Sequence, residues 1–162
     1  MGAELRAGLY LMTAKGEAVL RRILADHSPS AVSYVVVARD KGIEQDCYDT
    51  ITQLAKDAGI AVHDRQSVPN DLVQASLLIA VSWRWLIQTS TSQELIVLHD
   101  SLLPRYRGFS PLVSALINGD TEIGVTALIA DDEYDRGPIL AQSSVVIHYP
   151  ITIAEAISTI SP

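Results

Sequence analysis

The 162-residue sequence has little of several features that would place it in other classes of protein. A single cysteine, Cys47, excludes an internal disulfide and a zinc site built from several cysteines. The longest apolar runs, SLLIAV and SYVVVA, are far shorter than the roughly 20 residues of a membrane-spanning helix, and the N-terminus lacks the layout of a signal peptide. We therefore expect a cytoplasmic protein with no membrane partner.

Basic residues are also few. Lysine and arginine total 12 against 19 acidic residues, which gives a formal net charge of −7. This balance argues against a broad phosphate-binding surface, although a local basic loop remains compatible with it. Hydrophobic residues make up 48% of the chain, which predicts a compact globule and a single domain over residues 1–162.

Short aliphatic or β-branched runs alternate with helical patterns along the chain. The runs at residues 5–12, 31–38, 60–63, 76–82 and 95–99 read as buried strands. Between them, residues 16–27 and 43–59 space their apolar side chains on one helical stripe, and Gly59 ends the second helix. A late strand pair follows at residues 124–131 and 139–147. The pattern predicts an α/β fold with a Rossmann-like, doubly wound, mostly parallel sheet.

Two polar or reactive residues receive structural interpretations. Cys47 falls within the second helical pattern, where we expect a small core residue. The first strand-to-helix turn contains Gly16 without the further glycines of a nucleotide-binding loop, so we expect an ordinary turn with Lys15 in solvent.

His99 ends an apolar run, and ligands of such sheets bind outside the carboxyl ends of the strands. The loop DDEYDRGP holds four acids, but it lacks the longer pattern of a calcium loop, and we expect no metal site. Asp135 differs from its neighbours because Arg136, Gly137 and Pro138 follow it in a tight turn. An acid that faced the histidine would stabilise an imidazolium ion.

The segment LHDSLLPRYRGFSPLVSALINGDTEIGVTALIADDEYDRGPILAQ carries Ser-Leu-Leu-Pro, Gly-Val-Thr and Asp-Arg-Gly in that order. It closely resembles the catalytic segment of the formyltransferases that use 10-formyltetrahydrofolate and act on methionyl-tRNA, glycinamide ribonucleotide or nucleotide sugars. The resemblance implies that His99 is the catalytic histidine and Asp135 the catalytic aspartate. In that reaction an amine attacks the formyl carbon, His99 stabilises the oxyanion, and Asp135 supports the histidine and helps to move protons.

The same resemblance implies where the two substrates bind. The folate donor is expected between the loop after the fourth strand and the acidic loop, at Trp83, Arg84, Leu86, Ala130, Asp131 and Asp132. The acceptor is expected at the loop after His99, at Ser101, Arg105, Arg107 and Gly108. Solvated loop arginines are the alternative interpretation of Arg105 and Arg107.

One position departs from the family pattern. An asparagine is expected two residues before His99, and Val97 stands there. Side chains two apart on a strand share a face, so the asparagine would lie beside the histidine and donate to the formyl oxygen. Loss of one oxyanion donor typically costs about 10²–10³ in rate. Either Ser101, a backbone N–H or a shifted substrate geometry compensates, or strong catalysis has been lost.

For the acceptor we expect a nucleotide-linked amino sugar, because the loop RYRGFSP is similar to that of the transfer-RNA and nucleotide-sugar members and the acidic chain argues against transfer RNA. The chain ends partway into an expected helix, which leaves open a natural minimal domain or a truncation. Two alternatives remain, a formyltetrahydrofolate hydrolase and a weakly catalytic folate-binding or interaction module. We expect a small-molecule partner and leave a homodimer open.

Overall fold

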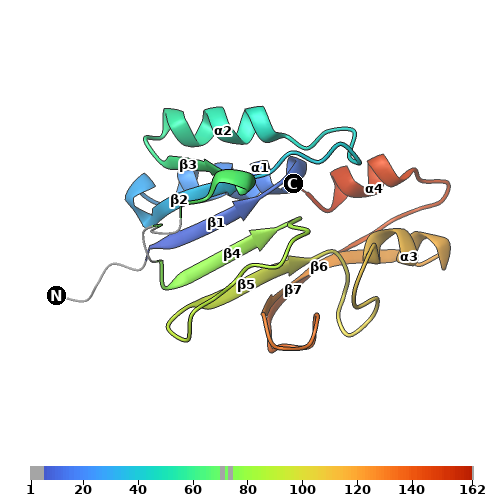
Figure 1. The fold of residues 1–162 in the computed structure, drawn as a ribbon. Helices are drawn as coiled ribbons and strands as arrows, with labels where there is room; N and C mark the ends of the chain where they lie inside the picture. Colours follow the sequence, from blue (N-terminus) through green and yellow to red (C-terminus); the bar gives the residue numbers. More distant parts are fainter. Residues whose placement is uncertain (1–5, 70–71, 73–74, 162) are drawn as a thin grey trace. The chain divides into compact units, whose positions relative to one another are not determined.

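The structure is a computed structural model that describes residues 6–69, 72 and 75–161. The chain forms two compact units, Met1–Leu95 (unit 1) and Ile96–Pro162 (unit 2), whose elements are labelled in Figure 1. Leu5, the first residue of the first predicted strand, lies outside the described residues.

Unit 1 is built on four parallel strands in the order β3-β2-β1-β4. Its elements are β1 (Ala7–Leu11), α1 (Thr13–Asp26), η1 (Pro29–Ala31), β2 (Val32–Val37), α2 (Tyr48–Asp57), β3 (Ala61–Asp64), η2 (Arg65–Ser67) and β4 (Leu77–Val81). The predicted strands and both helices are therefore confirmed, with ends shifted by a few residues. Gly59 has a φ of +73° and donates its N–H to Lys56 O, as expected of a helix-ending glycine.

The two faces of the unit 1 strands are covered differently. One face of the strands is covered by helix, and α1 and α2 contact each other there. The packing of α1 on β1 is tight, because a Cβ on Gly16 would lie 3.2 Å from Leu11 Cβ. Side chains alternate along a strand, so Tyr10 of β1 points to the other face. On that face the buried side chains of Tyr34, Val36 and Leu78 form a hydrophobic cluster, and Tyr10 and Trp83 pack against it.

Two expectations for unit 1 are wrong. Cys47 is not inside a helix: it is the residue before α2, with a left-handed φ of +56°, and it is half-buried. The apolar spacing predicted a helix that begins at residue 43, whereas α2 begins at Tyr48, after the left-handed turn at Cys47. Lys15 is not in solvent but buried, at 5% exposure, because it lies in the first turn of α1, where the helix packs on the sheet.

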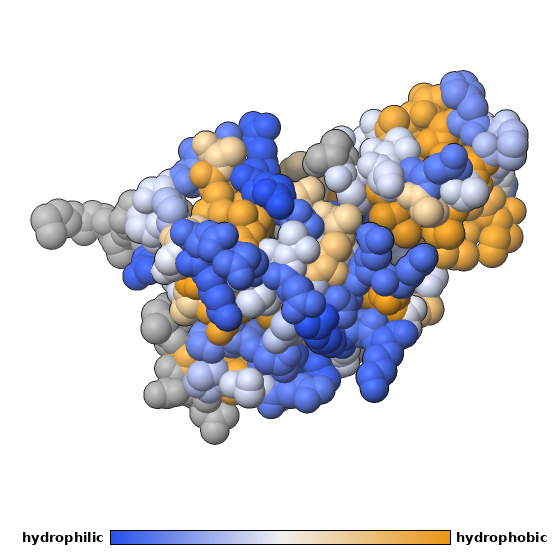
Figure 2. Space-filling view, turned by 90° about the horizontal axis from the view of Figure 1, so that it is seen from above, coloured by the Kyte–Doolittle hydropathy of each residue, from blue (hydrophilic) through white to orange (hydrophobic). Residues whose placement is uncertain are grey.

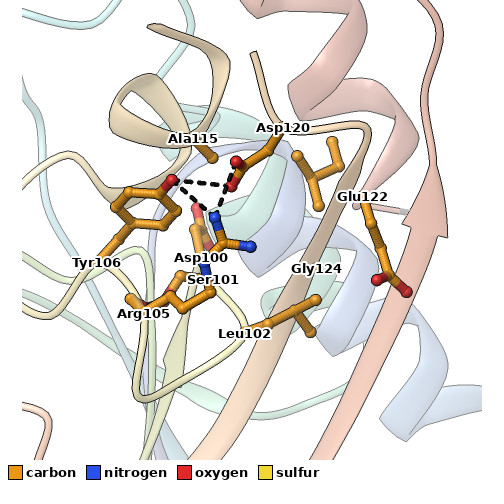
Figure 3. Close-up of a pocket in the computed structure, with 10 residues that line it drawn as sticks. Asp100, Ser101, Leu102, Arg105, Tyr106, Ala115, Asp120, Glu122 and Gly124 are labelled. Atoms are coloured by element: carbon orange, nitrogen blue, oxygen red, sulfur yellow. Dashed lines mark hydrogen bonds and ion pairs between the residues drawn. The ribbon is translucent and has the colours of Figure 1, made fainter. Parts of the chain in front are cut away.

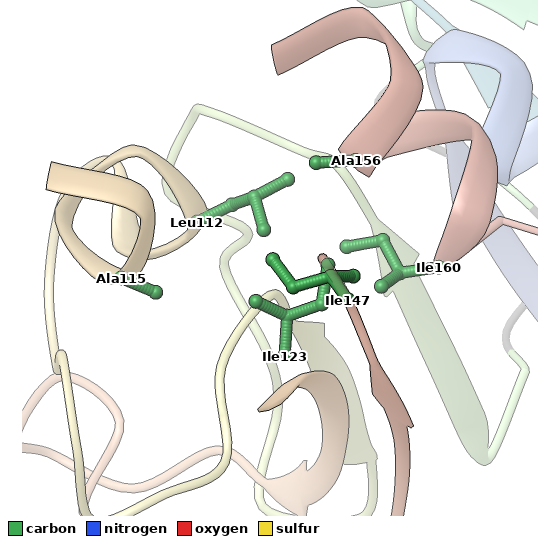
Figure 4. Packing of buried hydrophobic residues seen from close by; sticks show 6 residues of the cluster. All are labelled: Leu112, Ala115, Ile123, Ile147, Ala156 and Ile160. Carbon is green, nitrogen blue, oxygen red and sulfur yellow. The ribbon is translucent and has the colours of Figure 1, made fainter. Parts of the chain in front are cut away.

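Unit 2 holds the antiparallel strands, in the order β5-β6-β7. Its elements are β5 (Glu94–His99, which begins in unit 1), α3 (Pro111–Ile117), β6 (Glu122–Ile129), β7 (Ile139–Val146) and α4 (Ile153–Thr159). The predicted late strand pair is β6 and β7 and is confirmed. Figure 4 shows the core of the unit, in which Leu112 of α3, Ile123 of β6 and Ile160, the residue after α4, gather around Ile147.

Unit 2 also leaves apolar side chains in solvent. Figure 2 shows hydrophobic residues gathered where α3 and α4 lie, and the exposed members include Val113, Ile117, Ile153 and Ile157. Within the described ranges, every helix is too short or too polar to cross a bilayer.

Candidate active site

His99 is the last residue of β5, and the strand buries it. Its side chain is 8% exposed, and its backbone lies opposite Thr126 of β6 in the antiparallel register. The chain turns at once, since Ser101 N–H donates to His99 O at 2.9 Å. The ring is therefore held at the point where the strand gives way to the loop 100–110.

Both ring nitrogens of His99 face acceptors. Nε2 lies 2.8 Å from the backbone carbonyl oxygen of Tyr106, and Nδ1 lies 3.6 Å from Asp135 Oδ2. A carbonyl oxygen only accepts hydrogen bonds, so Nε2 carries a proton and Nδ1 is the nitrogen that gains or loses one. At 3.6 Å the Asp135 contact is an electrostatic pairing and not a hydrogen bond.

Asp135 is held by the loop that also holds His99. Its carboxylate accepts the Gly108 N–H at 2.8 Å through the same Oδ2 that faces the ring, and its carbonyl accepts from Arg107 Nε at 2.9 Å. Asp135 has a left-handed φ of +54°, which is uncommon without a glycine and recurs at functional sites. The chain must also pass close to β6 here, because a Cβ on Gly137 would lie 1.8 Å from Ile129 O.

Thr126 of β6, which is fully buried, holds the beginning of the loop 100–110. Its hydroxyl donates to Ser101 O at 2.6 Å and accepts from Leu103 N–H at 3.1 Å and Gln142 Nε2 at 2.9 Å. The Ser101 hydroxyl in turn donates to Arg105 O at 2.6 Å. Ser101 is 3% exposed, so its hydroxyl serves the loop in this structure, and its predicted role toward an acceptor stays a prediction.

Arg105, Tyr106 and Asp120 form a second polar cluster, called the outer cluster below, which lines a small pocket beside the loop 100–110 (Figure 3). Asp120 is its centre: it accepts from Arg105 Nη2 at 2.8 Å and from the Tyr106 hydroxyl at 2.9 Å. The hydrogen bond to Asp120 raises the pKa of the Arg105 guanidinium. The Tyr106 hydroxyl also accepts from Arg105 Nη2 and from Asn118 Nδ2. Sequence reasoning did not single out Tyr106, Asn118 or Asp120, although Asn-Gly-Asp at a helix end is a turn signal.

The residues predicted to bind folate fall in both units. In unit 1, Trp83 packs edge-on against Tyr10 and Trp85, Arg84 pairs with Asp40 at 2.8 Å, and Leu86 is 81% exposed.

In unit 2, Ala130, Asp131 and Asp132 follow β6 and are exposed, and Asp131 Oδ1 accepts the Asp132 N–H at 2.7 Å. Val97 is half-buried and lies two residues before His99 on the same strand, opposite Leu128. The folate site stays a prediction. Among the described residues, no group of three or more acidic, histidine or cysteine side chains is placed to hold a metal ion.

Residues 70–159 match the family model described as formyl transferase. A methionyl-tRNA formyltransferase of a Nitratiruptor species is 34% identical over 117 residues, which are 70% of this chain and 33% of that protein. The chain thus spans about a third of the length of this curated relative.

Solved structures show the same fold over nearly the whole chain. Glycinamide ribonucleotide transformylase 1 from Symbiobacterium toebii superposes with a TM-score of 0.77 and 20% identity, covering 99% of this chain and 82% of that one. WlaRD, a sugar 3N-formyl transferase solved with dTDP and 5-N-formyl-THF, gives a TM-score of 0.66 and 20% identity over 90% of this chain and 53% of that one. The predicted fold class is confirmed.

Proposed function

The chain belongs to the formyl transferase family, and we propose that it transfers a formyl group from 10-formyltetrahydrofolate to an amine. The observation that carries the proposal is the pairing of His99, at the end of β5, with Asp135, in the loop between β6 and β7, where Asp135 Oδ2 lies 3.6 Å from the ring nitrogen Nδ1. Attack of an amine on the formyl carbon develops negative charge on the formyl oxygen; the bond from that carbon to N10 of the folate then breaks, the amine loses a proton and the leaving N10 takes one up. His99, whose Nε2 is held by the Tyr106 carbonyl, suits both the stabilisation of the oxyanion and the transfer of the proton.

Each residue of the pair has a separate task in this proposal. The Nε2–H of His99 is committed to Tyr106 O, so Nδ1 is the site of proton exchange. Asp135 Oδ2 lies 3.6 Å from that nitrogen, so a proton that Nδ1 takes up during the reaction lies beside a carboxylate. Burial of the ring strengthens both interactions, because charges attract more strongly where water is excluded.

The donor is proposed to bind against the exposed residues that follow β6. Ala130, Asp131 and Asp132 offer exposed backbone and carboxylate groups of the kind that bind the amino and ring N–H groups of a pterin. These groups fit the chemistry of a folate.

For the acceptor we keep a nucleotide-linked amino sugar as the first candidate, because the chain carries a net charge of −7 and few basic residues for a long polyanion. Arg107 is the better candidate for a phosphate contact, since its side chain is exposed and its Nε donates to a neutral backbone carbonyl, whereas Arg105 is paired with the Asp120 carboxylate. Methionyl-tRNA is a second candidate acceptor, favoured by the 34% identity to a methionyl-tRNA formyltransferase. About two thirds of that relative lie outside the match.

The experiment is a single-turnover assay with 10-formyltetrahydrofolate and three acceptor conditions, namely a nucleotide-linked amino sugar, methionyl-tRNA and buffer alone. Mass spectrometry of the acceptor and chemical detection of formate separate transfer from hydrolysis. We expect a formylated amino sugar and a loss of product in Asp135→Asn.

The three other outcomes each change the proposal. Formylated methionyl-tRNA would exchange the first acceptor for the second. Formate without acceptor would indicate a hydrolase. Binding of a non-reactive folate analogue by calorimetry, with no product under any condition, would replace the transferase by a folate-binding module.

A further inference from the structure

The loop residue that holds His99 is itself held by a cluster that the proposed chemistry does not use. Tyr106 presents its backbone carbonyl to His99 Nε2 at 2.8 Å while its side chain points away, to Asp120. Figure 3 shows Tyr106 and Arg105 converging on Asp120 from the loop. One residue therefore touches the histidine with its backbone and the outer cluster with its side chain.

The backbone of Tyr106 needs that support. Its φ of +56° is in the left-handed region, which is disfavoured for an aromatic residue and persists where the surroundings impose it. The phenol hydroxyl makes three hydrogen bonds, since it donates to Asp120 Oδ2 and accepts from Arg105 Nη2 and Asn118 Nδ2. The ring packs against the core of unit 2. These contacts hold the residue in a conformation that it would otherwise leave.

Asp120 stands on a rigid base. It follows Gly119, whose φ of +71° closes α3, and its N–H donates to Ala115 O at 3.1 Å. Its carbonyl accepts from the Tyr149 hydroxyl at 2.9 Å. Its side chain is 13% exposed, so the carboxylate is shielded where it meets Arg105 and Tyr106.

We infer that Asp120 is a positioning residue for the reaction: through the Tyr106 hydroxyl it holds the Tyr106 carbonyl on His99 and so sets which ring nitrogen carries the proton. With Nε2 committed to the carbonyl, Nδ1 is left toward Asp135. The same loop reaches Asp135 two residues later through Gly108 N–H, so the cluster fixes both members of the pair. The inference rests on the proposed function for its catalytic meaning, while the geometry it describes exists without any substrate.

The test reads the histidine directly. In ¹⁵N-labelled protein, ring ¹⁵N shifts and two-bond ¹H–¹⁵N couplings give the tautomer of neutral His99. We expect the Nε2–H tautomer in the wild type and a several-fold larger Nδ1–H fraction in Tyr106→Phe, which keeps the ring in the core and removes the three hydrogen bonds. In the transfer assay kcat should fall by about 10-fold to 100-fold while KM changes little.

The Asp120 variants grade the effect. Asp120→Ala should match Tyr106→Phe, and Asp120→Asn should lie between it and the wild type, because an amide oxygen still accepts the phenol hydroxyl. Glu122→Gln is the matched control: it lines the same pocket and binds Ser144 instead of Tyr106, so the tautomer and kcat should not change.

The tautomer measurement tests the inference whether or not the protein transfers a formyl group. A wild type without the Nε2–H tautomer, or an unchanged tautomer in both Tyr106→Phe and Asp120→Ala, overturns the inference. If Tyr106→Phe does not fold, the milder Asp120→Asn decides by the same shifts. A protein that shifts its tautomer as expected yet transfers no formyl group contradicts the proposed function alone.

Discussion

Replacing Thr126 by Val tests how the loop after His99 is held. The two side chains have nearly the same shape, so the change removes the hydroxyl and leaves no cavity. Thr126 is fully buried, and the variant leaves Ser101 O without its donor and Leu103 N–H without its acceptor. Each of these two buried groups costs about 1–3 kcal/mol when it loses its partner, so we expect a loss of about 2–6 kcal/mol in the free energy of unfolding.

Urea denaturation followed by far-UV circular dichroism measures this loss, and amide exchange at Leu103 locates it. Thr159→Val is the matched control, because the Thr159 hydroxyl donates to Glu155 O at 2.8 Å in an exposed helix. Its cost should stay within about 0.5 kcal/mol. A Thr126→Val variant with the stability of the control and unchanged exchange at Leu103 would refute the buried network as the support of the loop.

Three further predictions concern the strand, the turn and the last helix. Val97→Asn should raise formyl transfer by up to about 10²-fold and lower the melting temperature, and unchanged turnover with intact folate binding would show that no donor is missing there. Gly137→Ala should destabilise the protein and slow transfer, since its Cβ would meet Ile129 O; an unaltered melting curve would contradict this close approach. The backbone hydrogen bond from Thr152 lowers the pKa of Glu155, so this carboxylate stabilises α4 above its unfolded pKa of about 4.5 and loses that effect as the pH falls through the lowered value. Glu155→Gln should therefore destabilise the protein at pH 7 and match the wild type in acid by thermal denaturation, whereas a pH-independent difference would argue against the charge.

The parts of the fold that follow from hydrophobic patterning were predictable from the sequence. Buried parallel strands such as Val32–Val37 are nearly continuous apolar runs, and few polar residues interrupt the signal. The pairing of His99 with Asp135 was predicted from the family resemblance, which carried over both residues. The antiparallel register alone does not give it, because β6 ends at Ile129, opposite Ile96 and three residues back along β5 from His99.

Features that depend on backbone conformation were not predictable. Cys47 fits an amphipathic stripe, yet its left-handed backbone places it before the helix. In the sequence Tyr106 has no feature that sets it apart from other loop residues. It contacts His99 through its backbone carbonyl, which every residue type carries. Asp120 gives no catalytic signal, since its partner Arg105 comes from the loop 15 residues earlier. Such contacts are set by tertiary structure, which single-residue propensities do not contain.

In the proposed function His99 and Asp135 are the residues that carry out formyl transfer. Single-turnover formation of the formylated acceptor is compared in the wild type and His99→Asn, with the urea midpoint recorded for both. We predict a fall of about 10²–10⁴ in the rate and little change in the midpoint, because the ring sits at a strand end and its polar contacts are with the loop. A folded His99→Asn variant that keeps more than about a tenth of the wild-type rate would contradict the account.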